Sequence, residues 1–174
     1  ALVRGKGIPN GIGSVQQCGH ALVQLVHRVG GVHTQQFRRG IGAYASSDVA
    51  AMKTQYKKVG SDYVLSGEKC WITNASLASF YVVFATGDPS KKHKGIAAFI
   101  VDRETPALQV GKHEDKMGHR ASDTATVHFE DVKVSAANLL APEGEGFKLA
   151  METFNQTRPD IGAMAAGLMQ RCLE

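Results

Sequence analysis

The sequence predicts a mainly β protein: a small antiparallel β-barrel or sandwich domain followed by a broken, truncated helix. Two observations carry this prediction. Short segments of β-forming residues, separated by turn residues, recur between residues 53 and 134, which is typical of small all-β domains. From Phe147 onward the apolar residues instead follow the spacing of an α-helix.

The strands are expected at residues 53–59, 63–66, 69–73, 80–86, 96–101, 108–112 and 124–134. Gly60, Ser61 and Asp62 form a plausible hairpin turn between the first two. The helix should then present Phe147, Ala150, Met151 and Phe154 on one face. Pro159 lacks a backbone N–H, so we expect the helix to break near it and to restart over residues 161–173, where the chain truncates it.

The composition excludes several classes of protein. At 174 residues, with 43% hydrophobic and 21% charged residues, the chain is typical of a soluble globular domain. No apolar run approaches the roughly 20 residues of a membrane-spanning helix. The net charge of +4 comes from residues 1–47, which hold five basic residues and no acid. The remaining chain is nearly neutral, so a nucleic-acid-binding face is not indicated.

Residues 1–43 form a Gly- and Arg-rich lead-in that we leave unassigned. The lead-in contains Cys18, His20, His27 and His33, but their spacing matches no common zinc site, so no metal is expected. The three cysteines of the chain are far apart in sequence. That odd, scattered set argues against a disulfide framework and fits a reducing compartment.

The most informative segment is residues 66–74, which contains Trp71, the only tryptophan, followed by Ile72 and Thr73. A strand of this kind can place a flat apolar ring and a hydroxyl against a planar cofactor, although a buried core tryptophan is the simpler interpretation. Four further segments follow at residues 116–124, 129–134, 144–148 and 157–159. In this order and spacing, the five segments resemble the flavin-dependent acyl-CoA dehydrogenase family.

The resemblance runs from about residue 47 to residue 174. It implies a middle β-domain at residues 44–140 and the beginning of a C-terminal helical domain at residues 141–174. It also implies that the cofactor is FAD, bound by Trp71, Ile72 and Thr73. The substrate, an acyl-CoA, would contact a set of polar residues formed by Ser47, Asn155, Gln156, Thr157 and Arg158.

Structural roles compete with these assignments. Ser47 could belong to a Ser-Asp turn, and Arg158 could bond the carbonyls freed before Pro159. Arg120 and Asp123 flank a tight loop and are expected to form a local salt bridge. Three lysines that could attract CoA phosphates are more simply explained as a solvated loop: Lys91, Lys92 and Lys94.

The resemblance also implies a mechanism that this chain does not complete. Family members remove the α-proton of the thioester with a glutamate, which lies in a later helical domain or directly before the arginine matched by Arg158. Here that position holds Thr157, which cannot serve as the base, so no catalytic residue is assigned. We expect a fragment of an acyl-CoA dehydrogenase that is inactive alone. A non-catalytic β-domain with a binding or assembly role, and a monooxygenase-like relative, remain alternatives.

The resemblance implies a role in fatty acid β-oxidation. Reoxidation by an electron-transfer flavoprotein and a homotetrameric complete protein are further expectations. The compartment would be the bacterial cytoplasm or the mitochondrial matrix, depending on the source. Acyl chain length and branching are not indicated, because the residues that close the acyl pocket mostly lie beyond this chain.

Overall fold

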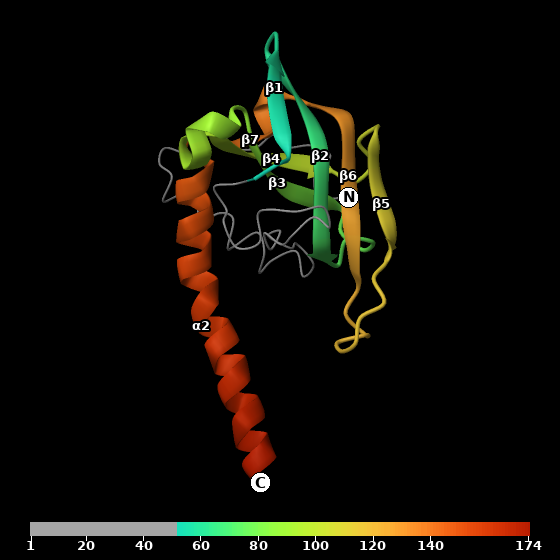
Figure 1. Ribbon diagram of the computed structural model, residues 1–174, viewed down its shortest axis with the longest axis vertical. Coiled ribbons are helices and arrows are strands. Elements are labelled where there is room, and N and C mark those ends of the chain that lie inside the picture. Colours follow the sequence, from blue (N-terminus) through green and yellow to red (C-terminus); the bar gives the residue numbers. More distant parts are fainter. Residues whose placement is uncertain (1–51) are drawn as a thin grey trace.

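The computed structural model describes residues 52–174 of the chain. Within them, seven strands form one sheet: β1 (Gln55–Val59), β2 (Asp62–Thr73), β3 (Phe80–Thr86), β4 (Ile96–Asp102), β5 (Leu108–His113), β6 (Thr124–Val134) and β7 (Leu139–Ala141). Two short 3₁₀ helices, η2 (Pro89–Gly95) and η3 (Ala136–Asn138), lie between strands, and a long helix, α2 (Gly146–Leu173), follows (Figure 1). The predicted mainly β domain followed by a helix is therefore confirmed.

The sheet is mixed rather than purely antiparallel. Its strand order is β5-β6-β2-β1-β3-β4-β7, and the β1–β3 neighbours are parallel, paired at Gln55 and Thr86. The Thr86 N–H also donates to the Thr54 carbonyl, at 2.9 Å. This short junction joins two antiparallel groups, so β3 and β4 run across the direction of β2 and β6 (Figure 1).

β2 is one continuous strand where the sequence predicted two. The predicted turn at Gly60 and Ser61 is confirmed, because Val59 and Asp62 pair directly across it. Gly67 lies at the expected gap, with φ of 128°, and a Cβ there would lie 2.9 Å from the Cα of Thr54. Glycine lets the strand bend against its neighbour without ending.

Two hydrophobic cores lie on opposite faces of β3, and every residue of this strand is buried. Alternate side chains of a strand point to opposite faces. Tyr81, Val83 and Ala85 therefore enter the core enclosed by the curved sheet, while Phe80 and Phe84 face a second core beneath the start of α2. The strand pair β3–β4 is thus the central layer of the molecule.

The start of α2 closes the second core. Phe147, Ala150, Met151 and Phe154 pack there, as their spacing predicted. Gly146 permits close contact, since a Cβ at this position would lie 2.8 Å from the Ala97 carbonyl carbon. Beyond this contact the helix projects away from the sheet (Figure 1).

The predicted helix break at Pro159 was wrong. α2 continues through Pro159 to Leu173. Proline leaves one carbonyl, that of Asn155, without its helical donor. Asn155 is exposed, so water can satisfy that carbonyl, and the helix does not need to break there.

A side-chain hydrogen bond connects β2 to the segment before α2. The Tyr63 hydroxyl donates to Glu143 Oε1, at 3.0 Å, and the Tyr63 ring packs edge-on against Tyr56 and Phe99. Burial, together with the charge of Glu143, raises the pKa of Tyr56 to about 12.

Among the helices of residues 52–174, none has both the length and the apolar character that a bilayer crossing requires.

Candidate functional site

The end of β2 carries a bulge at Trp71. The register between β2 and β6 shifts between Lys69 and Ile72, and Trp71 has φ of 59°. A left-handed conformation costs a non-glycine residue roughly 1–2 kcal/mol. Such strain persists only where surrounding structure imposes it, and it is concentrated at functional sites.

The bulge sets which side chains of this segment face outward. Cys70 and Ile72 are buried, whereas Trp71 and Thr73 are only partly buried. Trp71 and Thr73 are therefore the residues of this segment that remain accessible, one offering an indole ring and the other a hydroxyl. Ile72 enters the core, so its backbone, rather than its side chain, is available to a ligand.

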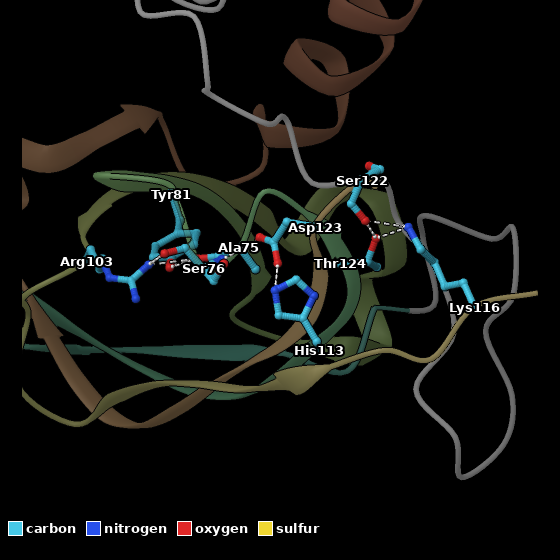
Figure 2. A network of polar contacts seen from close by, with 9 residues as sticks. All are labelled: Ala75, Ser76, Tyr81, Arg103, His113, Lys116, Ser122, Asp123 and Thr124. Carbon is cyan, nitrogen blue, oxygen red and sulfur yellow. Dashed lines mark hydrogen bonds and ion pairs between the residues drawn. The ribbon is translucent and has the colours of Figure 1, made fainter. Parts of the chain in front are cut away.

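The turn that follows β2 is held by carbonyl contacts on one side. The Tyr81 hydroxyl donates to the Ala75 carbonyl, at 2.7 Å. Arg103 Nη1 donates to the same carbonyl, at 3.1 Å, and also to that of Ser76. Figure 2 shows these side chains converging on the turn. Burial raises the pKa of Tyr81, which keeps its hydroxyl a donor.

Asp123 holds the same turn from the other side. Its Oδ2 accepts from the Ser76 N–H, at 2.8 Å, and its backbone carbonyl accepts from the Asn74 N–H, at 2.9 Å. Its Oδ1 lies 2.7 Å from His113 Nε2, on β5 (Figure 2). The Asp123 side chain is almost completely buried, with 6% exposed, while His113 is largely exposed.

The predicted Arg120–Asp123 salt bridge was wrong. Arg120 pairs instead with Asp115, at 3.6 Å, and donates to the Lys116 carbonyl. Lys116 Nζ in turn donates to the Ser122 carbonyl and to Thr124 Oγ1, both at 2.7 Å. The loop is therefore fixed by Lys116, which leaves Asp123 for the turn after β2.

The residues expected to contact substrate lie on another element or outside the described residues. Asn155, Gln156 and Arg158 are exposed on α2, beyond the part that packs on β4 and η2. Arg158 Nη1 donates to Asn155 Oδ1, at 3.3 Å, and its guanidinium lies 5.8 Å from the Phe154 ring. The side chain of Thr157 and all of Ser47 fall outside the description.

Two further sets of residues were considered in the sequence, the lysines between β3 and β4 and the candidate metal ligands. Lys91, Lys92 and Lys94 are exposed in η2, as expected for a solvated loop. The four metal-ligand candidates of the lead-in lie outside the described residues. Within residues 52–174, no group of three or more His, Cys, Asp or Glu residues is placed to hold a metal.

Sequence reasoning missed the roles of His113, Asp123, Arg103 and Tyr81. Asp123 was predicted only as the partner of Arg120 in a local salt bridge. A partial indication existed for the first pair, because His113 pairs with Ala125 across the β5–β6 hairpin, two residues from Asp123. No local pattern indicated Arg103 or Tyr81, because their contacts with the turn depend on how β3 and the end of β4 lie against it.

The site therefore combines an outward aromatic ring and hydroxyl on a strained strand end, held by buried polar contacts, with a helix start packed on the sheet. Comparison with known proteins shows the family of the chain. Residues 43–132 match the family model "Acyl-CoA dehydrogenase, middle domain". Residues 144–174 match "Acyl-CoA dehydrogenase, C-terminal domain". The chain belongs to the acyl-CoA dehydrogenase family.

Individual relatives are similar at substantial identity. A protein of Caenorhabditis briggsae named "Probable medium-chain specific acyl-CoA dehydrogenase 2, mitochondrial" is 47% identical over 133 residues, covering 75% of this chain and 33% of that protein. "Cyclohexane-1-carbonyl-CoA dehydrogenase" of Syntrophus aciditrophicus (strain SB) is 48% identical over 126 residues, covering 72% of this chain and 33% of that protein.

A solved structure agrees with the fold. The butyryl-CoA dehydrogenase of Megasphaera elsdenii matches with a TM-score of 0.63 and 42% identity, covering 68% of this chain and 30% of that one. The present chain thus spans about a third of the length of the curated relatives it matches.

Proposed function

We propose that this chain is part of a flavin-dependent acyl-CoA dehydrogenase, which oxidises an acyl-CoA thioester to the α,β-unsaturated thioester. The observation that carries the proposal is the paired outward display of Trp71 and Thr73 at the strained end of β2. Family membership supplies the reaction class. The names of the two relatives, a medium-chain and a cyclic acyl-CoA dehydrogenase, support acyl-CoA as the substrate class.

The end of β2 fits one face of a planar ring. Trp71 offers a flat apolar surface that this fold leaves partly exposed, and the partly exposed Thr73, two residues on, offers a hydroxyl. FAD, when bound, supplies the two-electron oxidation. Trp71 would hold one face of the cofactor ring and exclude water from it. The Thr73 hydroxyl would supply a hydrogen-bond donor, and the backbone of Ile72 would contribute further contacts.

Substrate contacts are proposed for Ser47, Asn155, Gln156, Thr157 and Arg158. The support for the α2 residues is their exposure and the exposed charge of Arg158. A guanidinium at this position suits carbonyl or phosphate oxygens of the CoA ester. The boundaries 44–140 for the middle β-domain and 141–174 for the start of the helical domain are part of the same proposal.

We propose further that the 174-residue chain, tested alone, does not dehydrogenate an acyl-CoA. The α-proton must pass to a base within hydrogen-bond reach. Thr157 occupies the position that holds the base in a minority of the family, and a hydroxyl is not a base at neutral pH. Of the nearest acids, Glu143 is engaged by Tyr63 and Lys58, and Glu152 lies more than one turn before Thr157.

An electron-transfer flavoprotein as electron acceptor, a homotetrameric complete protein and a function in fatty acid β-oxidation belong to the same proposal. A mitochondrial matrix location is proposed for a eukaryotic source, and the cytoplasm for a bacterial one. The support for the first location is the relative named as mitochondrial.

Flavin binding is tested by titrating the 174-residue chain with FAD and following the fluorescence of Trp71, its only tryptophan. We expect saturable quenching with weak affinity. Thr73→Val, which removes the hydroxyl at nearly constant volume, should weaken binding by about 2- to 13-fold, the value of one hydrogen bond. Val64→Thr, the reverse exchange at a partly buried position near the other end of β2, should leave affinity unchanged. Absence of saturable quenching in the unaltered chain would refute the flavin assignment.

Activity is tested in a single-turnover experiment with FAD, acyl-CoAs of several lengths and an artificial electron acceptor. We expect no substrate-dependent bleaching at an enzyme-like rate, because loss of a general base typically costs about 10²–10⁴ in rate. Rapid bleaching would contradict the proposed inactivity. Loss of that bleaching in Glu152→Gln would then identify Glu152 as the base.

A further inference from the structure

The carboxylate of Asp123 is a buried charge with contacts on both oxygens. Oδ2 accepts the Ser76 N–H, at 2.8 Å, and Oδ1 lies 2.7 Å from His113 Nε2. A buried carboxylate is costly unless its oxygens are paired. The contacts with Ser76 and His113 offset part of this cost, and they connect the Asp123 side chain to the turn after β2 and to β5.

Asp123 grips the chain just after the Trp71 bulge. Thr73 pairs with Thr124, the residue that follows Asp123. The Asn74 N–H donates to the Asp123 carbonyl, and the Ser76 N–H donates to its side chain. Backbone and side chain of one residue thus fix two positions, Asn74 and Ser76, directly downstream of Trp71 and Thr73.

The bulge needs such a constraint. Trp71 and Asn74 both have positive φ, 59° and 56°. Asparagine adopts this conformation more readily than most residues, but for a bulky residue such as tryptophan it is unfavourable. Arg103 and Tyr81 restrain the turn through its carbonyls. Asp123 differs from them because its side chain accepts a hydrogen bond from a backbone N–H of the turn, that of Ser76. Loss of the Asp123 carboxylate would therefore let the peptide at Ser76 rotate and relax the conformation of the turn.

We propose that Asp123 is a positioning residue that fixes Trp71 and Thr73 for the flavin, with His113 holding the Asp123 carboxylate in place. The inference rests on the proposed function only in naming flavin as the ring that Trp71 covers. His113 is itself on β5, so the hairpin β5–β6 carries both members of the pair. The Asp123 carboxylate connects this hairpin to the turn after β2, through His113 on one side and Ser76 on the other (Figure 2).

Four variants of the full chain test the proposal. Asp123→Ala removes both contacts, and Asp123→Asn keeps an acceptor for Ser76 but loses the charge. His113→Gln removes the outer partner. The matched control is Asp131→Asn on β6, the strand that Asp123 precedes, where the exposed carboxylate accepts from Ser66 Oγ, at 2.7 Å.

Two readouts separate positioning from folding and from flavin binding. Without ligand, the tryptophan band of near-UV circular dichroism and acrylamide quenching report the Trp71 environment, while far-UV circular dichroism reports the fold. We expect Asp123→Ala to weaken the band, to raise quenching about twofold and to weaken FAD binding about tenfold, as for one charged hydrogen bond. Asp123→Asn and His113→Gln should show smaller changes, and Asp131→Asn none.

An unchanged tryptophan band and unchanged quenching in a folded Asp123→Ala chain would overturn the proposal. If that variant does not fold, Asp123→Asn and His113→Gln decide it by the same measurements. Changes equal to those of Asp131→Asn would also overturn it. Should the unaltered chain bind no FAD, the proposed function fails, but the ligand-free readouts still decide whether Asp123 positions Trp71.

Discussion

The left-handed conformation of Trp71 makes an unusual stability prediction. At an ordinary strand position, glycine is less stabilising than alanine by about 0.5–1 kcal/mol, because it loses more backbone entropy on folding. At φ of 59°, alanine carries a steric cost of roughly 1–2 kcal/mol that glycine avoids. Trp71→Gly should therefore be more stable than Trp71→Ala, by about 0.5–1 kcal/mol.

Both substitutions should weaken flavin binding equally, because each removes the ring. An aromatic contact contributes about 0.5–1.5 kcal/mol beyond the burial of area, so the dissociation constant for FAD should rise by about 2- to 13-fold. The stability order of the two variants and their common loss of affinity together separate the backbone effect from the ring effect.

Urea unfolding followed by far-UV circular dichroism measures the stability of the full chain, and flavin fluorescence measures affinity. The matched control is Val64, a partly buried position of β2 that pairs in regular register with Lys57 and Lys133. There Val64→Gly should be less stable than Val64→Ala, the reverse order. Alanine more stable than glycine at position 71 would refute the bulge, and unchanged FAD affinity would refute the ring contact.

Three further outcomes follow from the fold. Leu149→Ala, at a fully buried position of the second core, should cost about 2–5 kcal/mol in urea unfolding, whereas Leu168→Ala on exposed α2 should change stability by under about 0.5 kcal/mol; equal effects would contradict the packing of α2. A double-mutant cycle of Tyr63→Phe and Glu143→Ala should give a coupling free energy of about 1 kcal/mol, because the two side chains share one hydrogen bond and Glu143 is half exposed. Zero coupling would refute a stabilising Tyr63–Glu143 hydrogen bond. Burial lowers the pKa of Lys69 from its ordinary 10.5 to about 7, so between these two pH values the native chain binds fewer protons than the unfolded chain. Stability should therefore rise as the pH rises from about 7 towards 10.5. Lys69→Met should flatten this rise, and an unchanged slope would contradict the burial of this lysine.

Local pattern was sufficient for several elements. The predicted strands at 80–86 and 124–134 coincide with β3 and β6. The face of α2 formed by Phe147, Ala150, Met151 and Phe154 packs as its spacing indicated. These features depend on side-chain periodicity over a few residues, which the sequence displays directly.

Elements that depend on a distant partner were not predicted. β7 has three residues and exists because it pairs with β4. β2 continues through Gly67 because β6 supplies hydrogen bonds on both sides of it. Pro159 remains helical because water can reach the carbonyl that it leaves free. In each case the deciding energy comes from a partner or solvent, not from the segment itself.

The candidate site divides in the same way. The sequence by itself determined which residues offer an aromatic ring and a hydroxyl, Trp71 and Thr73, because residue type and strand alternation are local properties. Only the tertiary structure decided that Trp71 takes a left-handed conformation and that Asp123, paired with His113, holds the turn beyond it. A buried carboxylate and a strained backbone are stable only when remote elements supply the contacts that offset their cost.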